Sequence, residues 1–353
     1  MKKLVIGGAI AAVLLVAAVW IGFDLFLVEK VDPITTAPSS VVPHAVPSTK
    51  VTPPRDDVQK YLDGIAKSLR KGETASVADQ FDLPRLYSHA VRYNLSPDPS
   101  LPKLIGSQHA RLYPALMEAF ARGGFGLPWD RIEFEQFLET PQGDLVASVL
   151  QISGDRVVPV WWWLVPTKDG FLIADVEDRL LGLRVSHQFA LLLGTGMAAE
   201  RAEKVSEAAK SIRDAAVLLG QDRSREADLN LGTAKRTLLP AVHTNAVLAL
   251  EGLAVAAVND PERAETIAAT LGDVPVADLI RAMAAGGEGW LEKRLNAAGK
   301  YELAIGPTPL TMSVRIQALM LRDKTAEASE LLDVGLKRFP DSPTLLAWAT
   351  VLP

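Results

Sequence analysis

The stretch from Leu4 to Phe23 limits what this chain can fold into more than any other feature. It reads LVIGGAIAAVLLVAAVWIGF and contains no charged residue. At about 1.5 Å of rise per residue, a helix of this length covers roughly the ~30 Å hydrocarbon core of a bilayer. Lys2 and Lys3 precede the run, and basic flanks stay on the cytoplasmic side. The sequence therefore predicts a single-pass anchor within residues 1–30, a cytoplasmic N-terminus and an extracytoplasmic body (periplasmic or equivalent).

A cleaved signal peptide is the alternative interpretation of the same stretch. The apolar region of such a peptide is usually ~7 to 15 residues long and ends at a site of small residues. The run here is longer, and the small pair Ala17 and Ala18 is followed by bulky Trp20, Ile21 and Phe23. Both features favour a retained anchor over a cleaved signal.

The composition excludes several classes of function. With 353 residues and 48% hydrophobic content, the chain has enough apolar material for about two folded domains. The net charge is only -5, and Lys and Arg do not cluster beyond pairs, so no nucleic-acid partner is expected. The chain has no cysteine, which rules out disulfides, thiolate metal sites and a cysteine nucleophile.

Residues 31–55 form a segment rich in Pro, Thr and Ser, with prolines at positions 33, 38, 43, 47, 53 and 54. Such a segment cannot hold a helix and favours an extended, polyproline-like conformation. We expect a linker that holds the body away from the membrane.

Residues 56–186 change from a helical to an alternating apolar period, which predicts an α+β domain. The expected helices run from about Asp56 to Leu69, from Ala75 to Val91 with a disturbance at Pro84, and from Leu104 to Ala121. The expected strands run from Ile132 to Phe137, Leu145 to Ile152, Val157 to Val165 and Phe171 to Val176. Turn residues such as Ser153-Gly154-Asp155 separate the strands, so consecutive antiparallel hairpins are predicted.

The run WWWLVPTKDGFLIADVEDRLLGLRVS, residues 161–186, resembles the final strands of the NTF2-like (cystatin-like) superfamily. The resemblance implies that residues 56–186 form a curved sheet over helices, shaped as a cone. Members of that superfamily include enzymes, ligand-binding proteins and non-catalytic modules on single-span envelope proteins, such as inner-membrane scaffold subunits of type IV secretion systems. The resemblance therefore leaves the function open.

Three consecutive tryptophans make both faces of one expected strand apolar. Side chains alternate along a strand, so Trp161 and Trp163 share one face and Trp162 lies on the other. One face would pack on the preceding helices. The other needs a cover, which could be the C-terminal domain, a second copy of the chain or a ligand.

Residues 187–353 show only helical spacing. The expected helices are Ala198 to Leu219, Ser224 to Leu239, Val242 to Val258, Pro261 to Leu271, Val276 to Ala285, Gly289 to Ala298, Thr308 to Leu321, Thr325 to Arg338 and Ser342 to Thr350. The run MSVRIQALMLRDKTAEASELLDVGLKRFPDSPTLL resembles a tetratricopeptide (TPR) repeat, although Gly335 replaces an expected Ala and puts the tight helix crossing there in doubt. We expect a TPR-like array, and such arrays expose surfaces that suit peptide or protein partners.

Gly194 and Gly196 imitate a dinucleotide-binding fingerprint, with Asp214 at a plausible distance. That site needs a parallel βαβ unit that sets a helix N-terminus against a pyrophosphate. No second buried strand follows. The pattern therefore favours a glycine-rich link between domains, and no cofactor is predicted.

No catalytic or metal site emerges from the spacing of reactive residues. His89, His109, His187 and His243 are scattered singly, which does not support a zinc site. An acidic cluster of Asp175, Glu177 and Asp178 could act as acid and base or hold a divalent cation. We interpret it instead as a solvated strand end that pairs with Arg179 or Arg184.

Taken together, the sequence predicts a membrane-anchored protein with an NTF2-like α+β domain and a TPR-like helical domain. The expected function is that of a non-catalytic envelope scaffold that binds another envelope protein or a peptide, and a homodimer is possible. The alternative is a small-molecule-binding protein or an enzyme that uses the interior of the cone. A packed apolar interior would favour the scaffold, and converging polar side chains would favour the alternative.

Overall fold

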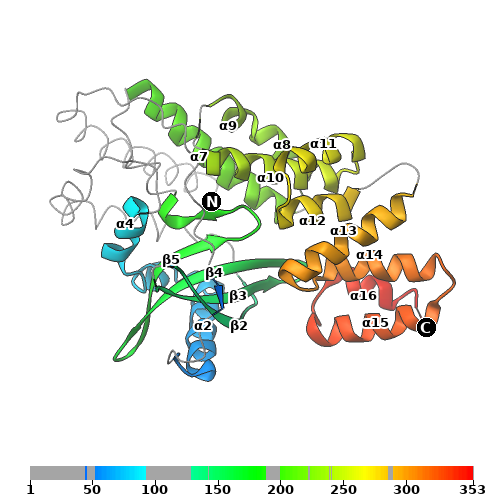
Figure 1. The fold of residues 1–353 in the computed structure, drawn as a ribbon, viewed down its shortest axis with the longest axis horizontal. Coiled ribbons are helices and arrows are strands. Elements are labelled where there is room, and N and C mark those ends of the chain that lie inside the picture. Colours follow the sequence, from blue (N-terminus) through cyan, green and yellow to red (C-terminus); the bar gives the residue numbers. More distant parts are fainter. Residues whose placement is uncertain are drawn as a thin grey trace, which may run out of the picture.

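The computed structural model describes residues 44–45, 52–92, 129–141, 143–187, 199–221, 223–237, 239, 241–284 and 289–352. An α+β part comes first and an all-helical region follows (Figure 1), as the sequence predicts. Within these residues, no helix has both the length and the apolarity needed to span a membrane. The predicted anchor, most of the linker and the predicted helix from Leu104 to Ala121 lie outside the described residues.

The sheet is a meander of six strands in which each strand pairs antiparallel with the next. The strands are β1 (His44–Ala45), β2 (Arg131–Glu139), β3 (Leu145–Ser153), β4 (Arg156–Thr167), β5 (Gly170–Asp178) and β6 (Leu183–Arg184). Gly143, Gly154 and Gly170 in the tight turns have positive φ values, which glycine adopts without steric cost. The four predicted hairpin strands are thus confirmed.

One face of the sheet, which we call the first face, packs on α2 (Arg55–Arg70), α3 (Thr74–Ala78) and α4 (Leu83–Arg92). Leu62, Phe134 and Trp162 are among the buried side chains of this core. The sequence predicts a helical segment from Ala75 to Val91 that Pro84 disturbs, and the structure divides this segment into α3 and α4. The reason is tertiary: Phe81 forms a parallel bridge with Ile173 of β5, which pulls the backbone out of helical geometry.

In the described residues, the C-terminal region is built of helices that pack on their neighbours in the chain. They are α7 (Ala199–Leu219), α8 (Ser224–Asn230), α9 (Gly232–Arg236), α10 (Ala241–Ala257), α11 (Pro261–Leu271), α12 (Pro275–Ala284), α13 (Trp290–Ile305), α14 (Pro309–Met320), α15 (Thr325–Arg338) and α16 (Pro343–Ala349). Two expectations were wrong. The helix predicted from Ser224 to Leu239 breaks before Gly232, a poor helix former. The helix predicted to stop at Ala298 continues because Tyr301 and Ile305 extend its buried face.

Gly335 allows α15 to approach its neighbours closely. A Cβ atom at this position would lie 3.0 Å from Leu345 Cδ1 and 3.1 Å from Met312 Cε. These distances are shorter than ordinary carbon contacts, so even a methyl group would force a neighbour to shift. The sequence left the helix crossing here in doubt, and the structure shows that the glycine makes it tight.

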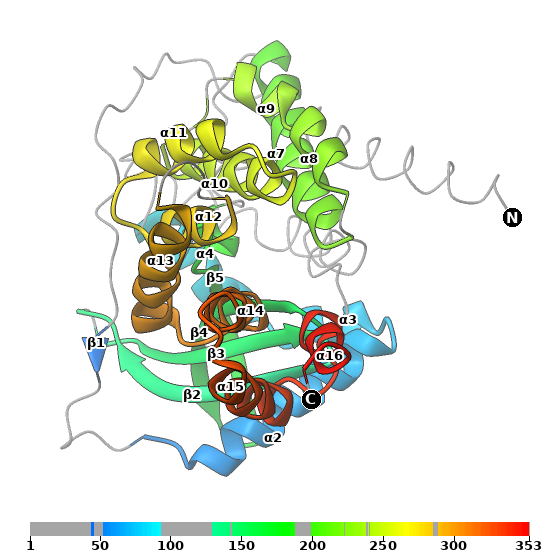
Figure 2. The same cartoon turned by 90° about the vertical axis from the view of Figure 1, so that its right-hand side faces the viewer.

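The helical region covers one end of the other face of the sheet, which we call the second face (Figure 2). Leu150, Ile152 and Val157 of this face join a cluster with Met312 of α14 and Phe339, which follows α15. Burial of these side chains removes a continuous apolar surface from water. Of the three covers that the sequence left open, the C-terminal domain is the one found at this end of the sheet.

Asp155, in the β3–β4 turn, joins the sheet to the N-terminus of α16. Its carboxylate accepts hydrogen bonds from the Ser342 hydroxyl, from Thr344 Oγ1 at 2.5 Å and from Thr344 N at 3.1 and 3.2 Å. Backbone N–H groups in the first turn of a helix have no partner within the helix, and a carboxylate there also suits the helix dipole. A second contact runs from the Arg131 guanidinium to the Arg338 carbonyl.

We expect Asp155→Ala to lower the free energy of unfolding by about 1 to 3 kcal/mol, because it removes a charged acceptor from several donors. Chemical denaturation of the full chain in detergent measures the change. Asp169→Ala is the matched control, since Asp169 also lies in a hairpin turn but is exposed, and it should stay within about 0.5 kcal/mol. Equal effects of the two substitutions would contradict the proposed role of Asp155.

Candidate functional site

The three tryptophans occupy the faces that the alternation predicts. Trp162 lies in the core of the first face, while Trp163 and the partly buried Trp161 pack with Leu138 and Val146 on the second face. The Arg184 guanidinium lies 4.4 Å from the ring centroid of Trp163, and Arg179 lies 4.6 Å from that of Trp161. At this end of the second face, arginines following β5 therefore cover the tryptophans by cation–π contacts.

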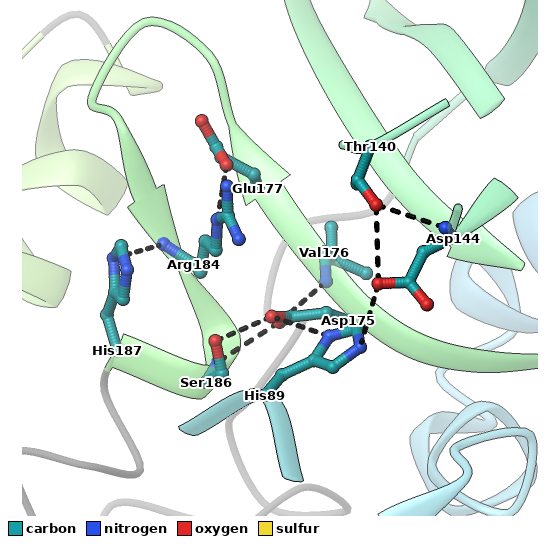
Figure 3. Close-up of polar contacts among 9 residues, drawn as sticks. All are labelled: His89, Thr140, Asp144, Asp175, Val176, Glu177, Arg184, Ser186 and His187. Atoms are coloured by element: carbon teal, nitrogen blue, oxygen red, sulfur yellow. Dashed lines mark hydrogen bonds and ion pairs between the residues drawn. The ribbon is translucent and has the colours of Figure 1, made fainter. Parts of the chain in front are cut away.

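Asp175 is the centre of a buried polar cluster (Figure 3), and His89 of this cluster lies next to Trp163. Its side chain is fully buried. Its carboxylate accepts hydrogen bonds from Ser186 Oγ at 2.5 Å, Ser186 N at 3.1 Å and Val176 N at 2.9 Å. The expectation of a solvated strand end was wrong for this residue. These bonds offset the cost of burying a carboxylate and join β5 to the chain just after β6.

His89 of α4 lies on the other side of Asp175. Its Nδ1 atom is 3.4 Å from Asp175 Oδ2, and its Nε2 atom is 4.0 Å from Asp144 Oδ2. Asp144 is held in turn by Thr140, whose hydroxyl accepts from Asp144 N at 3.0 Å. In a catalytic triad the histidine stands between the serine and the aspartate. Here the aspartate stands between Ser186 and His89, so the order of groups differs from that of a triad.

Glu177 and Arg184 form an ion pair across the short β5–β6 ladder. Arg184 Nε donates to Glu177 Oε2 at 2.5 Å, which confirms Arg184 as a partner of the acidic cluster. Burial raises the pKa of Glu177 above its ordinary value, while Arg184 acts in the opposite direction. Arg184 N also donates to His187 Nδ1 at 3.2 Å. An Nδ1 atom that accepts a hydrogen bond carries no proton, so this ring is neutral.

The loop between β5 and β6, residues 179–182, reaches into the helical region. Leu180 packs with Leu279 and Tyr301. Leu181 packs with one cluster formed by α10, α11 and α12 and with another formed mainly by α7 to α10. Asp178 shapes the turn, since its Oδ1 atom accepts from Leu180 N at 2.8 Å and from Leu181 N at 3.1 Å. Arg179 Nη2 donates to the Ala304 carbonyl of α13 at 3.5 Å.

Asp178, His187 and His243 are ionisable groups of this junction with strongly shifted pKa values. Burial raises the pKa of Asp178 to about 6. Burial lowers the pKa of His187 to about 4, and the nearby Arg184 adds to this effect. Burial also lowers the pKa of His243 on α10 to about 4, and neither ring nitrogen of His243 has a hydrogen-bond partner within the described structure.

A separate surface cleft of about 770 Å³ lies between α2, α3 and the β4–β5 turn. Tyr61, Ile65 and Phe171 are among the residues that line it. The rim carries both signs of charge, with Lys60 and Lys168 beside Asp57 and Asp169. No sequence motif pointed to this cleft, because its walls come from segments far apart in the chain.

Three of the candidate residues named from the sequence cannot be placed. His109, Gly194 and Gly196 lie outside the described residues. In the part of the chain that the structure describes, no group of three or more His, Asp or Glu residues could hold a metal ion. Sequence reasoning missed Ser186 and Thr140, whose roles depend on segments brought together only by folding. The acidic cluster was the one signal that pointed to this region.

Comparisons of the chain with protein-family models, with curated proteins and with solved structures found no match. The interpretation of this site therefore depends on its geometry. The carboxylate oxygens of Asp175 are used by hydrogen bonds within the protein, and Ser186 is fully buried. This arrangement is suited to holding β5, β6 and α4 together.

We expect His243→Leu to reduce the steepness with which the free energy of unfolding falls as the pH drops below 7. Unfolded chains protonate this histidine near pH 6.5, whereas the folded protein does so near pH 4. The unfolded state therefore binds more protons between these values, and stability falls as the pH drops through this window. The variant should reduce the slope by up to ~1.4 kcal/mol per pH unit, measured by denaturation from pH 7 to pH 4.5.

Asp178→Asn is a control variant, because it should change the pH dependence of the free energy of unfolding in the opposite direction. The folded pKa of Asp178, about 6, lies above its ordinary value of 3.8, so this group stabilises the fold at low pH and loses that contribution as the pH rises through 6. In the Asp178→Asn variant, the free energy of unfolding should therefore fall more steeply as the pH drops. If His243→Leu left the slope unchanged, or if both variants moved it in the same direction, the assigned environments would be wrong.

Proposed function

We propose that this chain is a single-pass, membrane-anchored scaffold of the cell envelope whose extracytoplasmic body binds another envelope protein or a peptide. In this proposal residues 1–30 anchor the chain and residues 31–55 act as a linker. The α+β domain is NTF2-like, and the helical domain is TPR-like and supplies the partner-binding surface. No nucleic acid, cofactor or metal takes part.

The observation that carries the proposal is that the helical region already holds a peptide segment. Leu180 and Leu181 insert among side chains of α10, α12 and α13, and Arg179 donates to a backbone carbonyl of α13. Apolar anchors combined with a main-chain hydrogen bond are a common mode of peptide recognition. Here the bound segment belongs to the same chain.

The polar cluster around Asp175 supports a structural role for this junction. Asp175, Ser186 and His89 are buried, and the Asp175 carboxylate accepts hydrogen bonds from Ser186 and Val176. General acid–base catalysis needs a group within hydrogen-bond reach of a substrate. The groups that the sequence offered for such chemistry instead connect the sheet to the helices.

The alternative function is small-molecule binding or catalysis inside the cone. The described interior next to the first face is filled by apolar side chains, among them Leu62, Phe134 and Trp162. The surface cleft lined by Tyr61 is the feature that favours the alternative. It receives less support, because its rim shows no excess of either charge and the Tyr61 hydroxyl is itself buried.

The anchor is tested by the topology of the chain in cells. Protease added to spheroplasts should digest the body and leave a small protected fragment that contains Leu4 to Phe23. The physical reason is that an apolar helix spanning the bilayer is inaccessible to protease. A mature protein that begins near Trp20 and is recovered from the soluble exported fraction would instead indicate a cleaved signal.

Partner binding is tested by placing a photo-crosslinking amino acid at Leu303 of the full chain in intact membranes. Leu303 is 91% exposed and is next to Ala304, which Arg179 contacts. We expect an adduct of discrete size. Leu229 on α8, which is 80% exposed, is the control and should give none. Identical patterns from the two positions would contradict a partner site on this part of the array.

A further inference from the structure

The β4–β5 hairpin extends beyond the rest of the sheet (Figure 1). The pairing of β3 with β4 ends at Val146 and Trp163, whereas β4 continues to pair with β5 from Leu164 to Thr167. A register shift between Trp163 and Leu164 marks a β-bulge at the base of this extension. Bulges bend a strand and are frequent next to binding sites. The tip of the hairpin forms one wall of the cleft whose other walls are α2 and α3.

The cleft has the size and the partly apolar lining of a small-molecule site. Its volume of about 770 Å³ lies within the range of roughly 300 to 1,000 Å³ that is usual for ligand pockets. Ile65, Val77 and Phe171 line it, and the ring centroid of Tyr61 lies 5.4 Å from that of Phe171. The Tyr61 hydroxyl is buried and has no hydrogen-bond partner within the described structure, which is costly. A ligand with an apolar body and a hydrogen-bonding group suits this lining.

Four charged side chains also line the cleft, two of each sign. Asp57 and Lys60 belong to α2, and Lys168 and Asp169 belong to the tip of the hairpin. All four are exposed, and their side chains have no hydrogen-bond or ion-pair partner among the described residues. Each of these two walls therefore carries one acid and one base. A ligand with a single charge meets attraction and repulsion on both walls, whereas a ligand with one charge of each sign can pair with all four groups.

We propose that the cleft between α2 and the β4–β5 hairpin binds a small zwitterion with an apolar body, such as an apolar dipeptide with free termini. Lys60 and Lys168 pair with its carboxylate. Asp57 and Asp169 pair with its ammonium group, and the aromatic rings contact its apolar part. Such charge-assisted hydrogen bonds are the strong ones. No residue that lines the cleft belongs to the helical region, so this site is separate from the partner-binding surface proposed above.

The first test uses the full chain in detergent and needs no substitution. Isothermal titration calorimetry compares the free dipeptide leucyl-phenylalanine with its N-acetylated form and its C-terminally amidated form. Each modification removes one charge and keeps the apolar body. Each should weaken binding by about 10-fold or more, because a charge-assisted pair is lost. Equal affinity of the three forms, or no binding of the free dipeptide, would overturn the proposal.

Paired substitutions then assign the two charges of the ligand to their partners. Lys60→Gln with Lys168→Gln should weaken binding of the free dipeptide by about 10-fold or more and leave the amidated form unchanged, since that form has no carboxylate. Asp57→Asn with Asp169→Asn should weaken binding of the free dipeptide and leave the acetylated form unchanged. 

Lys67→Gln is the matched control, because Lys67 is exposed on α2 but does not line the cleft. This variant should bind all three forms as the unmodified chain does. Equal losses for all three forms in both double variants would indicate a general effect on the fold and reject the proposed pairing. Unchanged binding of the free dipeptide in either double variant would reject it as well.

Discussion

The fold depends on covering a sheet that is apolar on both faces. An antiparallel sheet usually exposes one face to water, and its strands then alternate between apolar and polar residues. Here Leu150, Ile152 and Trp163 point to one face, while Val149 and Trp162 point to the other, and all five are buried. The first face is covered by the helices that precede it. The second requires a separate cover, and the helical region supplies it at one end.

The two ends of the second face are covered by different physical means. At the end near Val157 the contact with α14 and α16 is apolar, and Asp155 adds charged hydrogen bonds to the first turn of α16. At the end near Trp163, guanidinium groups lie on the indole rings. Arg184 can occupy this position because Glu177 neutralises it, and an unpaired charge at such depth would be costly. The acidic cluster is therefore part of the cover.

The helical region packs both on the sheet and on the β5–β6 loop. In this chain α14 to α16 meet the sheet, whereas α10, α12 and α13 hold the leucines of the β5–β6 loop. The sheet, the loop and the helices are consequently coupled. Arg179 takes part in this coupling, because its guanidinium lies over the Trp161 ring and donates to the Ala304 carbonyl of α13.

Local sequence patterns determined much of this fold, and contacts between distant segments decided the rest. Alternation over Leu145 to Ile152 and the glycines of the turns were enough to place the hairpins, because strand period and turn chemistry are local properties. The helical spacing from Pro261 to Leu271 was likewise sufficient to place α11. Propensity failed where tertiary contacts overrode it, at Phe81, which bridges to Ile173, and after Ala298, where Tyr301 continues the buried face. The sequence also marked Asp175, Glu177 and Asp178 as a group, but it could not show that Ser186 and His89 close around Asp175. Burial and pairing of these charges depend on which segments meet in space, and only the tertiary structure decides that.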